Sequence, residues 1–418
     1  MYWPKLNSSK IKHRVLEALS KNANYRSEYI LGIPGTYLDT EVFYDDAPFL
    51  KDAPFLSTLV ANPNHIGCHT LGDENEAMFT GTQEIERDVI RICAEEIFKA
   101  SPNEYDGYVA SGGTEANIQA LWIYRNYFSD ELSASNNEMA IVFSEDAHYS
   151  MTKGANLLNI DGIKIKVNKQ TRAIDIHDLE TSINSALKSG KKYFIVVVNM
   201  ATTMFGSVDD IEKVADLFNS LHLNYRIHVD GAYGGFIYPF THSENPFSFK
   251  NKNISSFTID AHKMLQAPYG TGIFLVRKNL MQHVCNDSAS YVKGKDYTLV
   301  GSRSGANAVC VWMILHAHGS VGWTYKMNDL MEKAKSVCDS LDEMGVKYYR
   351  NPYLNIIAIE ANQVDPELAK DFFLVPNTHE EQPQWYKIVL MPHVKQGILD
   401  SFLQQFKVSL QRRSLLKV

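Results

Sequence analysis

Two residues that could act together chemically lie thirty-three positions apart, each after a stretch typical of a buried strand. Asp230 ends "YRIHVD", and Lys263 follows "SFTID" within "DAHKMLQAPYGTG". A carboxylate in apolar surroundings is costly unless it is paired with a cation. A lysine held away from water has a lowered pKa and can attack a carbonyl carbon as a nucleophile. Each residue alone has a simpler interpretation, since Asp230 could cap a turn and Lys263 could be an exposed loop residue.

The segment "SGGTEAN" (residues 111–117) offers a third kind of group. It lies between a strand-like and a helical stretch, so its two glycines and Thr114 would stand at the positive end of a helix dipole, as in phosphate sites. The segment has neither the G-x-x-x-x-G-K-[ST] pattern of nucleotide hydrolases nor the G-x-G-x-x-G pattern of dinucleotide sites. On its own it could also be an ordinary helix cap.

The elements that must position these groups alternate along the chain. From about residue 105, apolar strand-like stretches such as "MAIVFS" and "KYFIVVVNM" alternate with helical ones such as "DDIEKVADLFNSL". This alternation predicts an α/β fold with a mostly parallel sheet and helices on both faces. Ligands of such sheets bind beyond the carboxyl ends of the strands. The residues that follow the strands include Thr114, His148, Thr202, Asp230 and Lys263.

Composition and charge exclude several classes of function. With 418 residues, the chain is long enough for about two or three structural units. A net charge of −7 gives no sign of a nucleic-acid or anionic-membrane partner. The five cysteines are widely spaced and form no C-x-x-C pair, which argues against a disulfide framework or a metal site. Because there is no signal-like N-terminus and no apolar run of about 18 residues, we expect a cytoplasmic protein.

A carboxylate, a nucleophilic lysine and a phosphate cradle on one sheet edge are the groups that hold pyridoxal 5′-phosphate. The phosphate would lie at the helix start, the ring nitrogen at Asp230 and the aldehyde at Lys263. His148, in "SEDAHYS", could stack on one face of the ring opposite the small Ala232.

The motifs "SGGTEAN", "DAHYS", "HVDGAYGGF", "DAHKMLQAPYGTG" and "GSRSG" resemble those of the pyridoxal-phosphate-dependent group II amino-acid decarboxylases, in their order and spacing. The chain is most similar to the compact branch with archaeal tyrosine/aspartate and bacterial histidine decarboxylases. This resemblance implies the aspartate-aminotransferase-like (type I) fold. The pattern along the chain divides it into an irregular N-terminal segment (1–60), a large domain that would bind the cofactor (61–300), and a smaller C-terminal α/β domain (301–418), where long helices begin to alternate with stretches such as "LNIIAIEA".

The resemblance also implies roles for single residues. Lys263 would bind the cofactor aldehyde, Asp230 would keep the ring nitrogen protonated, and His148 would stack on the ring above Ala232. Arg303, in "GSRSG", would position the substrate carboxylate, although a structural ion pair is an alternative. Tyr291, in a turn-rich segment, would protonate the substrate carbon, with Tyr297 and His148 as competitors. The remaining cofactor contacts would come from Gly113, Thr114, Asn117, Thr202 or Thr203, and His262.

The implied activity is decarboxylation of an L-amino acid to an amine and carbon dioxide. Acidic substrates (aspartate, glutamate) and aromatic ones (tyrosine) are the leading candidates, and a homodimer is expected. The first alternative is a carbon–carbon lyase resembling sphingosine-1-phosphate lyase, which shares a "GSRxG" element. An inactive binding protein that kept the fold is a lesser alternative, and an aminotransferase is disfavoured because "KIVLMPH" offers no arginine.

Overall fold

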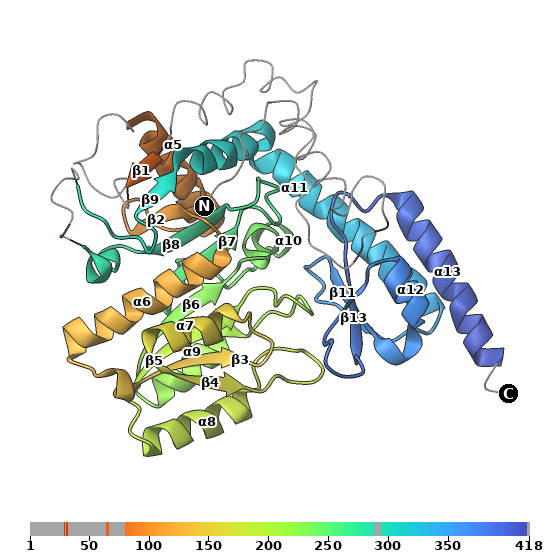
Figure 1. Ribbon diagram of the computed structural model, residues 1–418, viewed down its shortest axis with the longest axis horizontal. Coiled ribbons are helices and arrows are strands. Elements are labelled where there is room, and N and C mark those ends of the chain that lie inside the picture. Colours follow the sequence, from red (N-terminus) through yellow and green to blue (C-terminus); the bar gives the residue numbers. More distant parts are fainter. Residues whose placement is uncertain are drawn as a thin grey trace, which may run out of the picture.

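A seven-stranded sheet forms the centre of the larger part of the molecule (Figure 1). The computed structural model describes residues 29, 31, 64–66, 80–286, 288 and 294–415. The strand order is β2-β8-β7-β6-β5-β3-β4, and β8 alone runs antiparallel to its neighbours, which confirms the mostly parallel sheet. The strands are β2 (Tyr105–Ala110), β3 (Met139–Ser144), β4 (Asp161–Ile165), β5 (Tyr193–Asn199), β6 (Asn224–Asp230), β7 (Ile254–Asp260) and β8 (Gly272–Arg277).

Strands β3, β5, β7 and β8 are buried on both sides because helices cover both faces, whereas the edge strand β4 is mostly exposed. In β5, Phe194 and Val196 belong to one buried cluster, while Ile195 and Val197 belong to another. The second cluster is shared with α6 (Gly113–Leu132) and α7 (Ser150–Leu158). The first is shared with α5 (Thr80–Arg91), α8 (Ile176–Lys188), α9 (Ile211–Ser220) and α11 (Gly305–Glu343).

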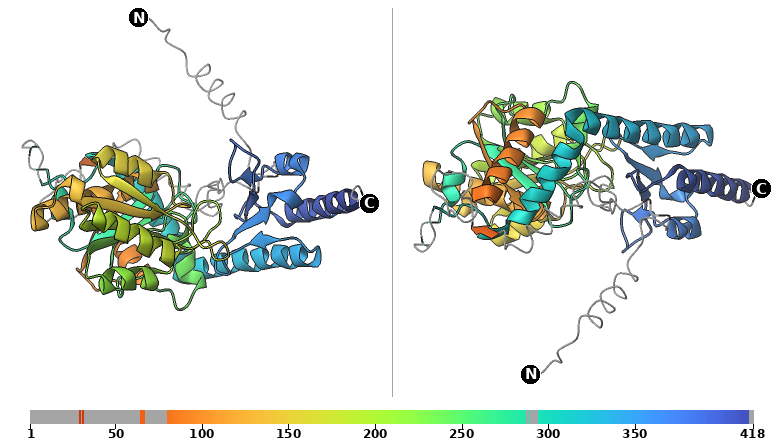
Figure 2. Two further views of the ribbon diagram at one scale, coloured as in Figure 1. Left: turned by 90° about the horizontal axis from the view of Figure 1, so that it is seen from below. Right: turned by 90° about the horizontal axis from the view of Figure 1, so that it is seen from above.

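A second, smaller sheet lies beside the first part of the molecule (Figure 2). It is antiparallel, with the order β10-β11-β13-β12. Its core is shared with the C-terminal half of α11 and with the remaining helices. The elements are β10 (Tyr348–Tyr349), β11 (Ile356–Glu360), α12 (Pro366–Asp371), β12 (Val375–Pro376), β13 (Trp385–Val389) and α13 (Gln396–Leu415).

Helix α11 connects the two parts, and it bends where Gly319 takes a non-helical conformation with φ of 61°. Residues before and after the bend, such as Ile314 and Leu330, pack into the core of the large sheet. Further on, Ala334 and Leu341 pack into the core of the small sheet. The domain division expected at residue 300 stays a prediction, since one helix contributes to both cores.

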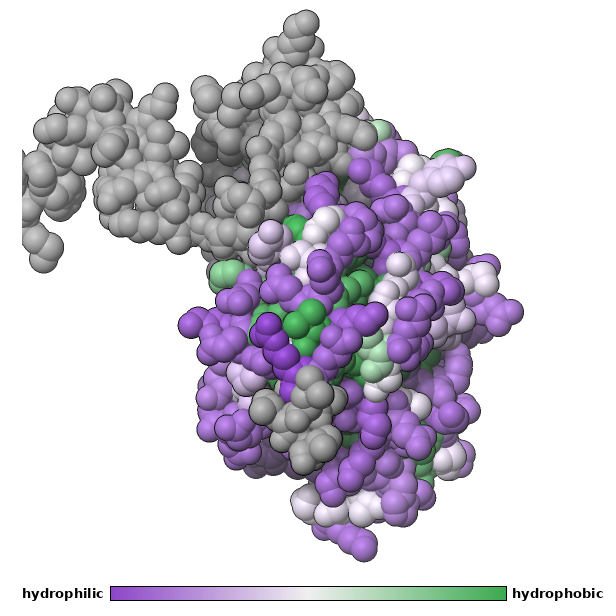
Figure 3. Space-filling view, turned by 90° about the vertical axis from the view of Figure 1, so that its right-hand side faces the viewer, coloured by the Kyte–Doolittle hydropathy of each residue, from purple (hydrophilic) through white to green (hydrophobic). Residues whose placement is uncertain are grey.

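The N-terminal segment is described at only a few positions. The backbone of Leu31 bonds to Phe372 and Val389 of the smaller part. Asn64–Ile66 forms β1, which pairs with β9 (Ser302–Ser304). The side of the molecule that carries α13 is mainly hydrophilic, with a smaller hydrophobic area near its centre (Figure 3). Across the described ranges, none of the helices is long and apolar enough to cross a membrane.

Candidate active site

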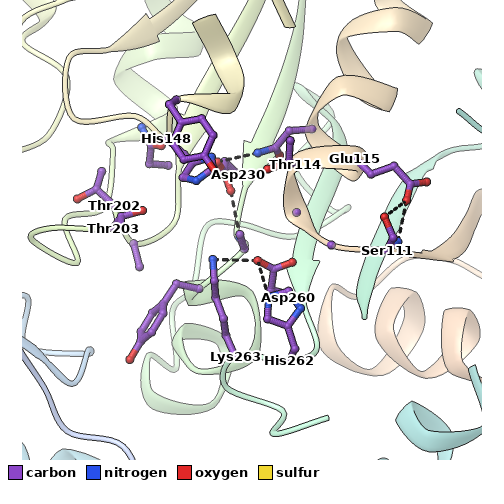
Figure 4. A pocket seen from close by; sticks show the side chains of 18 of the residues that line it. Ser111, Thr114, Glu115, His148, Thr202, Thr203, Asp230, Asp260, His262 and Lys263 are labelled. Atoms are coloured by element: carbon purple, nitrogen blue, oxygen red, sulfur yellow. Dashed lines mark hydrogen bonds and ion pairs between the residues drawn. The ribbon is translucent and has the colours of Figure 1, made fainter. Parts of the chain in front are cut away.

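A cavity of about 470 Å³ opens at the carboxyl edge of the large sheet. The ends of β5, β6 and β7 contribute Asn199, Asp230 and Asp260 to its lining. Side chains from these separate strands point into one space (Figure 4). Ten of the residues singled out from the sequence line this cavity, namely Gly113, Thr114, Asn117, His148, Thr202, Thr203, Asp230, Ala232, His262 and Lys263.

Lys263 is fixed at the cavity by an acidic neighbour. Its Nζ lies 2.8 Å from Oδ2 of Asp260, the last residue of β7. Asp260 is 4% exposed, and its other oxygen has no hydrogen-bond partner in the described structure. His262 lies on the same carboxylate, with Nε2 3.7 Å from Oδ2, and its ring stacks on Tyr269. The lysine amine is therefore held in a defined place inside the cavity.

The two glycines of "SGGTEAN" line the cavity with backbone atoms that no side chain covers. Gly112 precedes α6 with φ of 148°, a conformation that favours glycine. A Cβ atom on Gly113 would lie 3.0 Å from Asp260 and 3.1 Å from Ala232, so a larger residue would crowd the site. The cavity therefore meets the free amides at the start of a twenty-residue helix, where an anion is favoured.

Asp230 is a buried carboxylate whose hydrogen bonds come from neutral groups. It is 6% exposed, and it accepts hydrogen bonds from Nδ2 of Asn117 at 3.0 Å and from the amide of Ala232 at 3.1 Å. Burying a carboxylate with neutral partners leaves its charge without a counter-charge. A ligand that carries a positive charge would supply one.

His148 lies beside the same network. Its Nδ1 is 2.8 Å from Oγ of Ser150, which in turn is 3.0 Å from Nδ2 of Asn117. Burial lowers the pKa of His148, because the charged imidazolium is poorly solvated there. Its ring is 4.0 Å from that of Tyr149, which also lines the cavity.

The two adjacent threonines differ in what they present. The hydroxyl of Thr202 is 2.6 Å from Oγ of Ser207 and is buried. Thr203 is exposed, and its carbonyl oxygen accepts a hydrogen bond from Nζ of Lys387 at 3.0 Å. Both threonines proposed from the sequence line the cavity, but the hydroxyl of Thr202 already forms a hydrogen bond with Ser207.

The structure does not bring Arg303 to this cavity. Its guanidinium forms a buried ion pair with Glu86 of α5 and donates to the carbonyl of Val109 at 3.1 Å. The structural ion pair that the sequence left open as an alternative for Arg303 is therefore present, and its carboxylate-binding role stays a prediction. Tyr291 lies outside the described residues. The carbonyl of Tyr297 accepts from Gln119, and its ring packs on the α6 side of the sheet.

Sequence reasoning missed two charged residues near the site. Asp260 stands three positions before Lys263 at the end of a strand, and this spacing could have indicated it. Lys387 lies in the second sheet, 184 positions from its partner Thr203, and no local sequence pattern indicates that the two are in contact. Lys387 is 4% exposed, and burial together with the charge of Lys263 lowers its pKa to about 8.

These residues fit pyridoxal phosphate in each of its parts. The amides at Gly112–Gly113 would receive the phosphate, and the neutral-partnered carboxylate of Asp230 would pair with the ring nitrogen. The amine of Lys263, which lines the same cavity, would bind the aldehyde.

Comparison with known proteins agrees with this chemistry. Residues 64–347 match the family model described as pyridoxal-dependent decarboxylase conserved domain. A tryptophan decarboxylase of Clostridium sporogenes is 49% identical over 406 residues, which is 97% of each chain. A histidine decarboxylase of Vibrio anguillarum is 31% identical over 277 residues, 66% of this chain and 68% of that one.

The fold is also found in solved structures. A sphingosine-1-phosphate lyase of Burkholderia pseudomallei superposes with a TM-score of 0.79 at 17% identity, covering 100% of this chain and 94% of that one. Such a likeness concerns the fold and confirms the α/β architecture expected from the sequence. With the family model spanning most of the described chain, the cavity residues and the relatives lead to one conclusion: the chain belongs to the pyridoxal-dependent decarboxylase family and is a pyridoxal-phosphate-dependent carboxy-lyase.

Proposed function

We propose that this enzyme decarboxylates an aromatic L-amino acid, with tryptophan as the first candidate. The observation that carries the proposal is the 49% identity with a tryptophan decarboxylase along 97% of both chains. The relative that acts on histidine is only 31% identical. Nearly full-length similarity includes the segments that form the walls of the cavity as well as the cofactor motifs.

The lining of the cavity supports an aromatic substrate over an acidic one. Tyr149, Tyr233 and Tyr269 all contribute to it, and aromatic walls favour a flat apolar side chain. Of the described residues that line the cavity, Lys263 is the only lysine or arginine. An acidic amino acid carries two carboxylates, and the amine of Lys263 is committed to the cofactor. The acidic substrates expected from the sequence therefore find less support.

The residues of the chain divide the work as follows. When bound, pyridoxal phosphate withdraws electrons from the bond that breaks at the substrate α-carbon. Lys263 holds the cofactor before the substrate arrives, and Asp230 keeps a negative charge beside the ring nitrogen. His148 lies over the cavity on the Asp230 side and can hold a proton for the α-carbon. Tyr291 remains a second proposed donor.

Lys387 is the cation that we assign to the substrate carboxylate in place of Arg303. Its ammonium donates to the carbonyl of the cavity residue Thr203, which uses one of its three hydrogens. Burial, and after it the charge of Lys263, lowers the pKa of Lys387. Lys387 itself does not line the cavity, but it contacts Thr203, which does, so a carboxylate bound beside Thr203 would lie next to a buried ammonium.

Replacement of Lys387 by methionine should separate binding from stability. The loss of a charge-assisted hydrogen bond should raise KM for the amino acid by roughly 10- to 100-fold.

Folding lowers the pKa of Lys387 from 10.5 to about 8, so the unfolded chain binds more protons between these values. Wild-type stability should therefore rise with pH through that window, and this rise should shrink in the variant. The exposed Lys370→Met is the matched control, and urea unfolding at pH 7.5 and 9.5 measures the difference. An unchanged KM would remove Lys387 from substrate binding.

The proposed substrate is tested by a panel of twenty amino acids, with amine and carbon dioxide measured separately. We expect the highest kcat/KM for tryptophan, and lower values for tyrosine and phenylalanine. A preference for aspartate, glutamate or histidine would overturn the proposal while leaving decarboxylation intact. Release of an aldehyde without carbon dioxide would instead support the carbon–carbon lyase alternative.

A further inference from the structure

A chain of hydrogen bonds runs from the core of the protein to the cavity and ends on His148. It starts at Tyr124 in α6 and passes through side chains of β6 and β7 that do not line the cavity. Every link is between side chains that are at least partly buried. The links, in order, join Tyr124 to Ser256, Ser256 to His228, His228 to Asn117, Asn117 to Ser150, and Ser150 to His148.

The direction of this chain is set by Asp230. A carboxylate only accepts hydrogen bonds, so the group of Asn117 that lies 3.0 Å from it must be the amide NH₂. The carbonyl oxygen of Asn117 then faces Nε2 of His228 at 2.9 Å. A flipped amide would place two acceptors against each other at Asp230. His228 must therefore donate from Nε2.

His228 is a neutral ring with one defined tautomer. It is fully buried, and burial lowers its pKa to about 3. With the proton on Nε2, its Nδ1 accepts from the hydroxyl of Ser256 at 2.6 Å, and Thr258 is a second neighbour of the Nε2 proton at 3.2 Å. The hydroxyl of Ser256 accepts in turn from Tyr124. The inner half of the chain thus points its hydrogens toward Asn117.

The outer half carries this direction to His148. The amide of Asn117 has two hydrogens, one for Asp230 and one for Oγ of Ser150. Because that oxygen accepts from Asn117, its own hydrogen is directed to Nδ1 of His148 at 2.8 Å. The backbone amide of Ser150, which can only donate, reaches the same Nδ1 at 3.2 Å. Two donors therefore converge on Nδ1, which must be an acceptor.

We propose that Ser150, Asn117 and His228 are positioning residues that hold the neutral ring of His148 with its proton on Nε2. The proposal rests on the proposed decarboxylation and deepens it, since it states which atom of His148 carries the proton. His148 then presents a protonated Nε2 to the substrate, so this nitrogen acts as a hydrogen-bond donor and not as an acceptor. The same Asn117 amide bonds both Asp230 and Ser150, so Asp230 and His148 are oriented together through Ser150.

Nitrogen-15 NMR of the full chain with labelled histidine tests this directly, because protonated and unprotonated ring nitrogens resonate far apart. His148→Gln identifies the signal among the fourteen histidines. We expect an unprotonated Nδ1 and a protonated Nε2 in His148, both with and without pyridoxal phosphate. Every sample without cofactor keeps the same charged groups near this ring, namely Asp230, Lys263, Asp260 and Lys153. A proton found on Nδ1, or on both nitrogens at pH 7.5, overturns the proposal.

Two variants test the chain rather than the tautomer alone. Ser150→Ala removes the hydroxyl donor, so the Nδ1 signal should move toward that of an unbonded nitrogen and His148 should take up a proton at higher pH. His228→Phe, which removes the donor to Asn117 and so breaks the chain two links away, should move the same signal in the same direction by a smaller amount. Thr152→Ala, an exposed hydroxyl on the same helix, is the control and should change nothing. Unchanged His148 signals in a folded Ser150→Ala protein would overturn the chain. Because these signals do not depend on turnover, they stay informative even if the substrate panel fails.

Discussion

Replacement of Lys263 by alanine should reduce kcat by roughly 10³-fold or more and remove the visible absorbance of the bound cofactor. The amine lies in the cavity at 2.8 Å from Asp260, beside the glycine amides and opposite Asp230. Alanine keeps the backbone and leaves these other contacts in place. The cofactor could then still enter by its phosphate and ring, but no nitrogen of the protein could bind its aldehyde.

The measurement combines a spectrum with single-turnover kinetics. Lys278→Ala is a suitable control, because Lys278 also pairs with a buried carboxylate, Asp106, at 2.6 Å but lies away from the cavity. We expect this control to keep the cofactor spectrum and kcat of the original protein. Absorbance and turnover like those of the original protein in Lys263→Ala would mean that another amine holds the cofactor. Lys387 would then be the first residue to replace.

The sequence allowed the sheet and much of the cavity to be predicted because both depend on local patterns. Apolar runs such as "KYFIVVVNM" are buried on both faces, and in β5 alternate residues indeed enter different cores. Parallel strands share one carboxyl edge, so residues that follow them must meet there. Asp230 and Lys263 satisfy this rule, and they line the same cavity. What each of them does in the reaction stays a prediction.

The parts that could not be predicted depend on contacts between distant segments. The antiparallel β8 reads as one more apolar run, and nothing in "GIFLV" reveals its direction. Lys387 meets Thr203 across the two sheets. "GSRSG" matched the expected motif, but it does not indicate that Arg303 pairs with a glutamate 217 positions earlier. A sequence motif therefore predicts which residue is present, but the residue that it contacts depends on the fold.

Replacement of Arg303 by alanine should destabilise the protein by about 3–5 kcal/mol, because it leaves the buried carboxylate of Glu86 uncompensated. Glu86 is fully buried and Arg303 is 6% exposed. Both also bind the outward edge of β2, the last strand of the sheet. Glu86 accepts from the amide of Val109 at 2.7 Å, and Arg303 donates to its carbonyl. The ion pair thus takes the place of a further strand at the sheet edge.

A double variant separates this structural role from the substrate role that the motif suggested. Arg303→Met combined with Glu86→Leu removes both charges, so it should cost less than the two single replacements added together. The exposed pair of Arg91 and Asp88 provides the control, since Arg91→Ala should cost less than about 1 kcal/mol. Urea unfolding of the cofactor-loaded protein gives these energies. In the folded fraction of Arg303→Ala, KM should stay within about twofold of the original value, because the guanidinium is not at the cavity. Full stability with a large rise in KM would return Arg303 to the substrate carboxylate and leave the edge of β2 to be held by other groups.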